Sequence, residues 1–331
     1  MAKPLAIVGG ETLIGRELLD VLKEAGFGAR LRPVTGGEPG ARVIVEEEGG
    51  AAVMLSLDAE ALAGSSAVLL AGSAASSLKV VELLGRRAIP VIDATGALED
   101  RPSARLRCPA LETPGAPIAA TRLHVVAHPA AIALGLFFRR LHVIQPFRSS
   151  VVTVLEPASE RGQAGLDELH KQTVGLLSFQ KLEKKIFDAQ AAFNLLSAYG
   201  EDAPHPLEAI ELRIERNLAT LMSWGPPAPM PSLRLVQAPV FHGYSFPVWV
   251  EFEKFPNLET LAASLSGEGI DVRSEDQEPP TNAGAAGQNG IAIGSIAPDR
   301  NHPHAVWFWI VCDNLRLTAE SALEAVRELA G

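Results

Sequence analysis

A turn from a strand into a helix, at residues 125–136, is where chemistry is expected first in this sequence. The stretch reads VVAHPAAIALGL: an apolar strand, a turn at His128 and Pro129, and the start of a helix. A helix N-terminus lowers the pKa of a thiol placed on it, so such a turn suits a nucleophilic cysteine. The first turn of the expected helix instead carries Ala131 between apolar neighbours. The sequence therefore predicts the geometry of a nucleophile site without a nucleophile.

His242 and Tyr244 form a second candidate pair, in the stretch FHGYS. Residues two apart on an extended strand face the same side, so both could line a working pocket, or both could be structural. A phenol with an ordinary pKa of about 10 is a weaker general base at neutral pH than a histidine at about 6.5.

The remaining reactive side chains form no recognisable site. Cys108 and Cys312 are far apart, without metal-ligand spacing, and are interpreted as packed thiols. His302 and His304 form an H-x-H pair in a loop with no third ligand, so no metal site is predicted.

A glycine turn follows the first apolar run, LAIV at residues 5–8. A dinucleotide-binding turn has three glycines at G-x-G-x-x-G spacing. Here Gly9 and Gly15 are the outer glycines, Thr12 stands where another glycine is expected, and Glu11 adds negative charge. Two interpretations stay open: dinucleotide binding, or a tight turn retained for packing.

Strands that alternate with helices predict an α/β fold for the first half of the chain. The pattern favours a Rossmann-like, doubly wound parallel sheet over residues 1–127, an NAD(P)-binding-like domain. After the first strand, turn and helix, the expected strands are 67–72, 89–95 and 124–127, with a helix at 77–87.

From residue 128 the sequence pattern no longer alternates strand and helix, and it predicts long strands and separate helices. Residues 128–313 are expected to form an α+β domain with a mixed or antiparallel sheet, and a C-terminal helix, 314–331, is expected to complete the first domain. The expected elements of the second domain are extended segments at 141–157, helices at 162–184 and 207–222, strands within 233–253 and 306–313, and loops at 225–232 and 278–290.

Composition narrows the function classes. The formal charge of the 331-residue chain is −10, which disfavours binding to nucleic acid. Two isolated cysteines fit a reducing cytoplasm, and the start MAKPLAIVGG fits a first strand better than a signal peptide. No apolar run reaches the length of about 20 residues that a bilayer requires, so no membrane segment is expected.

Six segments, in order, resemble the aspartate-semialdehyde dehydrogenase family, and most of all its usg-type members. AIVGGETLIGRELLDVL resembles that family's G-x-T-G-x-V-G turn, and VVAHPAAIALGL resembles its N-P-N-C-S-T-I-Q turn. The other segments are AVLLAGSAASSLKVVELLGRRAIPVIDATGAL, AAFNLLSAYGED, VQAPVFHGYS and FWIVCDNLRLTAESALEAV.

The resemblance implies reversible reductive dephosphorylation of an aspartyl phosphate with NADPH, by a cysteine nucleophile and a histidine base. The nucleophile position falls on Ala131 and the glutamine four residues later on Gly135. The general base falls on Tyr244, and the arginine for the substrate carboxylate on Gln237. The resemblance therefore implies that the family's reaction is absent.

The family's phosphate-binding positions have also lost the residues that the reaction requires. A family arginine falls on Glu99, a helical lysine falls near Glu211, and another lysine falls on Leu317. Acidic residues repel a phosphorylated substrate that the family's cations attract.

The resemblance also implies a possible cofactor site, and NADP is the possible cofactor. Arg32, after a second strand expected in the stretch ARLRPVTGG, could hold a 2′-phosphate, and Asn314 matches a family asparagine near the nicotinamide. The candidate cofactor-binding residues are Gly9, Thr12, Leu13, Ile14, Gly15, Arg32, Gly72 and Asn314.

Two hypotheses follow. The first is a catalytically silent homologue with a nucleotide-binding or dimer-mediated regulatory role, as a homodimer or in association with an active paralogue. The alternative is an active NAD(P)-dependent oxidoreductase on a different small substrate, which uses His242 or Tyr244.

Overall fold

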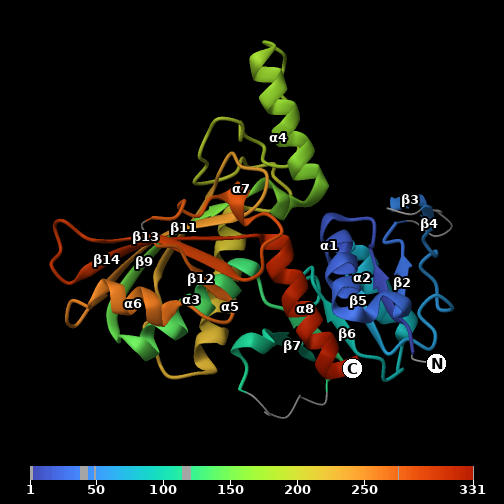
Figure 1. The fold of residues 1–331 in the computed structure, drawn as a ribbon. Coiled ribbons are helices and arrows are strands. Elements are labelled where there is room, and N and C mark those ends of the chain that lie inside the picture. The colour runs from blue at the N-terminus through green and yellow to red at the C-terminus, as the bar shows by residue number, and fades with distance from the viewer. Residues whose placement is uncertain (1–2, 38–43, 48–49, 114–120, 275, 331) are drawn as a thin grey trace. The chain divides into compact units, whose positions relative to one another are not determined.

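The computed structural model describes residues 3–37, 44–47, 50–113, 121–274 and 276–330. The chain divides into two compact units. Unit 1 comprises Met1–Ala127 and Thr318–Gly331, and unit 2 comprises His128–Leu317. In Figure 1, where colour follows the chain, unit 1 comprises the blue and cyan elements and, from Thr318 on, the red C-terminal helix.

Unit 1 is built on a six-stranded parallel sheet in the order β2-β1-β5-β6-β8-β7. The buried strands β1 and β5 are continuous apolar runs, as a sheet covered on both faces requires. The strands are β1 (Leu5–Val8), β2 (Leu31–Val34), β5 (Ala67–Leu70), β6 (Val91–Asp93), β7 (Ala104–Arg107) and β8 (Leu123–Val126).

Three α-helices belong to this sheet: α1 (Leu13–Leu22), α2 (Ala74–Leu84) and α8 (Asn314–Ala330). Because β1 has β2 on one side and β5 on the other, the chain leaves β1 in one direction and later returns on the opposite side. Ligands of open α/β sheets bind at such a switch point. A hairpin, β3 (Ile44–Glu47) with β4 (Gly50–Val53), and short turns η1 (Lys23–Phe27), η2 (Gly28–Arg30) and η3 (Pro109–Leu111) complete the unit.

The C-terminal helix α8 is attached to unit 1 by a buried charge. Arg107, at the end of β7, has no exposed side-chain surface and pairs with Glu112 at 2.6 Å and with Glu328 on α8. A buried guanidinium requires such partners, so this arginine depends on the last helix of the chain.

Unit 2 contains a six-stranded mixed sheet in the order β10-β9-β11-β14-β13-β12. The two outer pairs are parallel and the inner pairs are antiparallel. The strands are β9 (Phe147–Glu156), β10 (Ser232–Gln237), β11 (Tyr244–Phe252), β12 (Ile270–Val272), β13 (Ile291–Pro298) and β14 (Ala305–Cys312).

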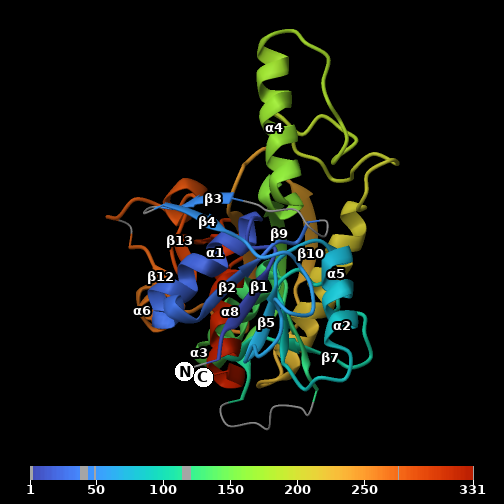
Figure 2. The same cartoon turned by 90° about the vertical axis from the view of Figure 1, so that its right-hand side faces the viewer.

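The helices of unit 2 are α3 (Pro129–Ile144), α4 (Gly162–Leu177), α5 (Leu207–Ser223), α6 (Leu258–Leu265) and the short α7 (Asn282–Ala285), with a 3-10 turn η4 (Ala158–Arg161). Helix α3 packs against α5 and α6. Helix α4 projects away from the sheet in both views (Figure 1 and Figure 2). In the described part of the chain, no helix is both long enough and apolar enough to cross a bilayer.

The α/β fold class is confirmed, with one parallel and one mixed sheet, but several element bounds differ from expectation. The helix expected at 162–184 ends at Leu177, because the chain turns at Phe179, where φ is +54°. The extended segment expected from residue 141 begins only at Phe147, after Pro146, since α3 continues to Ile144. Strand β7 was not expected, because its sequence, ARLR, is half charged.

Candidate functional site

The turn into α3 has the expected backbone and an apolar first turn. His128 is the N-cap: its Nδ1 accepts a 3.3 Å hydrogen bond from the Ala130 N–H, and Pro129 takes the first helical position. The His128 N–H donates to Asn217 Oδ1 at 2.8 Å. Ala131 is fully buried, so the helix presents a methyl group there and no nucleophile.

Beside this turn, unit 2 holds a group of buried and partly buried polar side chains that we call the acid–arginine cluster. Its centre is Glu156, the last residue of β9, together with Glu160 and Arg161 on η4. The side chains around this centre are His128, Tyr199, Gln237, Tyr244 and Asn314.

Arg161 and Glu156 form an ion pair of 2.7 Å. Glu156 is fully buried, and burial raises its pKa to about 7 even though Arg161 acts in the opposite direction. The Glu156 carboxylate in turn raises the pKa of Arg161 above its ordinary value, against the effect of burial. Glu156 Oε2 and Arg161 Nε have no hydrogen-bond partner within the described residues. A carboxyl of this kind can take up or release a proton near neutral pH.

Glu160 is the second acid of the cluster. Burial raises its pKa, while Arg161 and a 2.7 Å hydrogen bond from Asn314 Nδ2 lower it. His128 Nε2 lies 3.7 Å from Glu160 Oε2. Burial and the charges of Arg213 and Arg161 lower the pKa of His128, so this contact joins a neutral imidazole to the carboxyl and is not an ion pair.

Asn314, expected near a nicotinamide, is held within unit 2. Its Oδ1 accepts hydrogen bonds from Ser159 Oγ at 3.1 Å and from the Gly243 N–H at 3.2 Å. Its Nδ2 donates to Glu160 as described above. The amide is therefore engaged on both sides by this chain's own groups.

The resemblance places Gln237 at the position of a substrate-binding arginine. In the structure, hydrogen bonds to neighbouring groups of unit 2 hold its amide in place. Its Nε2 donates to the carbonyl oxygens of Glu156 at 2.9 Å and Ala238 at 2.8 Å. Its Oε1 accepts a 2.6 Å hydrogen bond from the Tyr199 hydroxyl. Burial raises the pKa of Tyr199 above its usual range, so that hydroxyl remains a donor.

His242 and Tyr244 do not share one face of a strand, which corrects the premise of the alternative hypothesis. Strand β11 begins at Tyr244, and Gly243 before it has φ +81°, so His242 lies on the preceding turn. Tyr244 is fully buried, and burial together with Glu160 raises its pKa well above 10. Its hydroxyl interacts electrostatically with Glu160 but makes no hydrogen bond of normal geometry within the described residues. Such a phenol is a poor base.

The sequence did not single out Glu160, Arg161 or Arg213. Two charged residues inside the otherwise small-residue run ASERGQAG were the available signal for the first two. On α5, Arg213 acts on the pKa values of His128 and Glu160. Glu211 instead accepts a 2.6 Å hydrogen bond from the Leu235 N–H on β10.

In unit 1, the loops after β1, β2 and β5 meet at Gly9, Gly36 and Gly72, which we call the glycine cradle. Gly9 has φ +89°, and a Cβ on it would overlap the backbone of Gly72. A Cβ on Gly36 would lie 3.2 Å from Gly9 Cα and 3.3 Å from Gly72 Cα. Only glycine allows these backbones to approach so closely.

Thr12 and Gly15 fix the start of α1 against this cradle. The Thr12 hydroxyl caps the helix by accepting from the Gly15 N–H at 3.0 Å. It also lies within hydrogen-bond distance of the carbonyl oxygens of Gly9, 2.9 Å, and Ala71, 2.8 Å, and donates to one of them. A Cβ on Gly15 would overlap the Gly9 carbonyl. Leu13 and Ile14 form the first turn of α1.

Arg32 does not lie where a 2′-phosphate would be expected. It is the second residue of β2, not the residue after it, and its Nη1 donates to the carbonyl oxygens of Ala61 at 3.0 Å and Ala63 at 2.9 Å. Geometry therefore opposes the phosphate role given to this residue above.

The other singled-out residues are placed as follows. Burial raises the pKa of Cys108 to about 12 and raises that of Cys312 beyond its usual range, so neither thiol is a ready nucleophile. Gly135 and Leu317 are buried, and Glu99 is half-buried. Among the described residues, no group of three or more His, Cys, Asp or Glu side chains is arranged to hold a metal ion.

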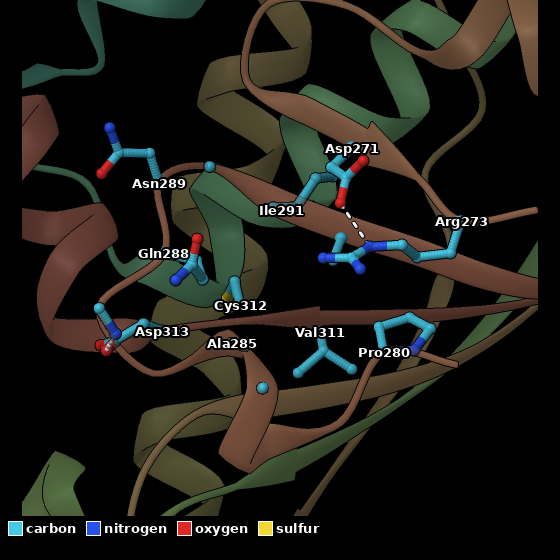
Figure 3. A pocket seen from close by; sticks show the side chains of 14 residues that line it. Asp271, Arg273, Pro280, Ala285, Gln288, Asn289, Ile291, Val311, Cys312 and Asp313 are labelled. Carbon is cyan, nitrogen blue, oxygen red and sulfur yellow. Dashed lines mark hydrogen bonds and ion pairs between the residues drawn. The ribbon is translucent and has the colours of Figure 1, made fainter. Parts of the chain in front are cut away.

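Unit 2 also has a pocket of about 430 Å³ that is separate from the predicted site residues (Figure 3). One side carries the ion pair of Arg273 with Asp271, 2.6 Å, and another carries Asp313, whose Oδ2 accepts from the Gly287 N–H at 2.8 Å. The lining alternates acidic, basic and apolar groups and shows no catalytic arrangement.

Comparison with known proteins gives a consistent result over the whole chain. The family model for the semialdehyde dehydrogenase dimerisation domain matches residues 141–317. A USG-1 protein homolog from Pseudomonas aeruginosa is 29% identical, over 98% of this chain and 97% of that protein. An aspartate-semialdehyde dehydrogenase from Synechocystis is 24% identical, over 98% and 95% of the two chains.

Solved structures show the same relationship. A probable aspartate-semialdehyde dehydrogenase from Pseudomonas aeruginosa superposes with a TM-score of 0.82 at 27% identity, covering 99% of this chain and 98% of that chain. An aspartate semialdehyde dehydrogenase with NADP from Candida albicans superposes with a TM-score of 0.64 at 12% identity over 99% and 98%, which shows the shared fold.

Proposed function

The chain belongs to the semialdehyde dehydrogenase family, and from that premise we propose that it is a member without the family's dehydrogenase reaction. Its role is then that of a dinucleotide-binding or regulatory protein that acts as a homodimer. The observation that carries this proposal is the methyl group of Ala131 on the first turn of α3, beside a polar cluster whose charged groups bind one another.

The acid–arginine cluster supports the loss of turnover. A substrate with a carboxylate or phosphate requires cations that are available to bind it. In this chain Arg161 is paired with Glu156, and the Glu160 carboxyl is held by Asn314. Glu156 and Glu160 thus take the positive charge and the hydrogen-bond donor that a substrate anion would require.

Retention of a dinucleotide site is supported by the glycine cradle. The turn after β1 lies at the switch point of the sheet and leads into the N-terminus of α1, where folds of this kind bind a pyrophosphate through backbone N–H groups. When bound, a nicotinamide dinucleotide supplies hydride chemistry. The residues that would hold it are the backbone of Gly9 to Gly15 and the loop at Gly72.

The homodimer is proposed to form through unit 2. On one face of its sheet, Val151, Trp249 and Trp307 stand in register across β9, β11 and β14. Val151 is 48% exposed and Trp307 is 43% exposed, so this face presents apolar surface that a partner copy would cover.

The test of the enzymatic part is an assay with aspartate semialdehyde, phosphate and either NAD⁺ or NADP⁺, which follows the absorbance of the reduced nicotinamide. We expect no turnover above a protein-free blank, whereas an aspartate-semialdehyde dehydrogenase in parallel is active. Turnover that disappears in Tyr244→Phe or His242→Ala would instead establish the alternative oxidoreductase. Tyr244→Phe removes only a hydroxyl that makes no hydrogen bond of normal geometry within the described residues, so it should fold.

The test of the dimer is the mass of the particle in solution, measured by light scattering after gel filtration. Wild-type protein should have twice the mass of the chain, and Trp307→Asp should have the mass of one chain. Leu212→Asp, at a 52% exposed site on α5, is the matched control and should stay dimeric. A monomeric wild-type protein would refute this part.

A further inference from the structure

Glu11, inside the glycine turn, is the feature of unit 1 that the proposed dinucleotide site does not yet explain. Its Oε1 accepts a 2.8 Å hydrogen bond from the Gly36 N–H and lies 3.2 Å from the Thr35 hydroxyl, which donates to it. Its side chain therefore spans from the loop after β1 to the loop after β2. Its other oxygen, Oε2, is buried and has no partner within the described residues.

The end of β2 is where dinucleotide-binding folds distinguish their two cofactors. A carboxylate there accepts hydrogen bonds from the adenine-ribose hydroxyls of NAD, whereas an arginine nearby binds the 2′-phosphate of NADP. Strand β2 ends at Val34, and no acidic residue follows it directly, since Thr35 and Gly36 come next. Glu11 brings a carboxylate to the same place from the neighbouring loop.

The described donors at this end of β2, on Thr35, Gly36 and Gly37, already have acceptors. The Gly36 N–H and the Thr35 hydroxyl could bind phosphate oxygens, but both point at Glu11 Oε1. Arg32 is turned to the carbonyl oxygens of Ala61 and Ala63. The surroundings thus hold an acceptor, the buried Oε2, that has no partner among the described residues, and they present a like charge to a phosphate.

We infer that Glu11 makes the glycine cradle selective for a dinucleotide with free adenine-ribose hydroxyls, NAD(H), over one with a 2′-phosphate, NADP(H). This inference rests on the proposed dinucleotide site and deepens it. Glu11 Oε2 accepts from the ribose hydroxyls of NAD(H) and repels the 2′-phosphate of NADP(H).

The experiment is a calorimetric titration of the full chain with NADH and with NADPH, repeated for Glu11→Gln. Glutamine keeps the length of the side chain and can still accept from the Gly36 N–H through Oε1, but it replaces the charge. Wild-type protein should bind NADH at least about tenfold more tightly than NADPH, since hydrogen bonds to charged acceptors are the stronger ones. In Glu11→Gln the preference should fall by about tenfold or more, through weaker NADH binding and stronger NADPH binding.

Glu82→Gln is the matched control, because it removes the same charge from an exposed position on α2. It should leave both affinities unchanged. Glu11→Asp keeps the charge on a shorter side chain and should keep the sign of the preference, so the inference remains testable if Glu11→Gln does not fold.

The outcomes separate the inference from the proposal beneath it. Equal binding, tighter NADPH binding, or an unchanged ratio in a folded Glu11→Gln protein overturns the selectivity and leaves the dinucleotide site standing. Failure of both nucleotides to bind at millimolar concentration refutes the dinucleotide site, and the selectivity with it.

Discussion

The glycine cradle of unit 1 is formed by backbone atoms, whereas the acid–arginine cluster of unit 2 is formed by side chains. The cradle consists of backbone: three loops that approach closely because Gly9, Gly36 and Gly72 have no side chains. The cluster consists of side chains, among which Glu156, Glu160 and Arg161 use one another as partners. A site made of backbone keeps its shape when neighbouring side chains change, whereas a site made of side chains changes its chemistry with each substitution. The following experiments test this difference between the two regions.

The largest effect is expected for Gly15→Ala at the base of the cradle. A Cβ there would overlap the Gly9 carbonyl and lie 2.8 Å from Gly10 Cα, so the loop must shift. We expect a loss of about 3 kcal/mol in the free energy of unfolding, as for severe overpacking. Urea denaturation measures it. Gly28→Ala, where the nearest atom would be 3.9 Å away, is the control, and equal losses in the two variants would contradict the close-approach argument.

A loss of similar or slightly smaller size is expected for Arg161→Met in the cluster. The change leaves the buried Glu156 and the partly buried Glu160 without their main cation, and breaking a buried pair in this way costs about 3 kcal/mol. Arg273→Met removes the partner of the exposed Asp271 and should cost less than about 1 kcal/mol. Thermal and urea unfolding of both variants decide this. If Arg161→Met is as stable as Arg273→Met, the ion pair does not hold the cluster.

A third test uses pH. Glu156 keeps its proton to about pH 7 in the folded chain, whereas an ordinary glutamate releases it near 4.5. Between these values the folded state binds more protons than the unfolded state, so stability falls as pH rises. Glu156→Gln does not titrate. We expect wild-type protein to lose stability relative to this variant by about 1 kcal/mol per pH unit across that window.

The comparison cancels other titrating groups, including His128. The lowered pKa of His128 acts in the opposite sense, since it favours the folded state as pH rises to its ordinary value of 6.5. A pH-independent difference between wild-type protein and Glu156→Gln would show that Glu156 has an ordinary pKa.

The smallest effects are expected for two helix caps, one in each unit. Thr12→Ala removes the cap of α1 and also the tie to the Gly9 or Ala71 carbonyl, so about 1–2 kcal/mol should be lost. Asn257→Ala removes a single 2.9 Å cap bond from α6 in unit 2 and should cost about 0.5–1 kcal/mol. Differential scanning calorimetry can rank them. The reverse order would mean that the Thr12 tie contributes nothing.

The sequence predicted what depends on backbone and on hydrophobic pattern. The turn at His128, the glycine turn at Gly9 to Gly15 and helix α5 follow from turn residues and apolar spacing, and all are present. Strand β7 was not predicted because its arginines interrupt the apolar alternation. Arg107 is buried because two acids neutralise it, Glu112 nearby in the sequence and Glu328 on the distant helix α8.

The contents of the candidate site were less predictable. Which atoms surround Glu160 depends on residues from η4, α3 and the start of α8, and their proximity has no local signal in the sequence. Arg32 was assigned to phosphate because it was expected to follow the second strand, but it lies within that strand, and the bounds of a strand are poorly fixed by sequence. Glu11 was recognised as a negative charge, while its bond to Gly36 required the structure.

The pairing of Arg107 with Glu328 has a consequence for the order of synthesis. A ribosome releases residues 1–127 long before it makes the acid on α8 that completes the buried ion pair. The nascent first unit therefore holds a guanidinium that lacks one of its two final partners, while the whole of unit 2 is translated and can fold. Closure of the first unit is thus a late event in synthesis, since it has to wait until the whole of unit 2 has been made.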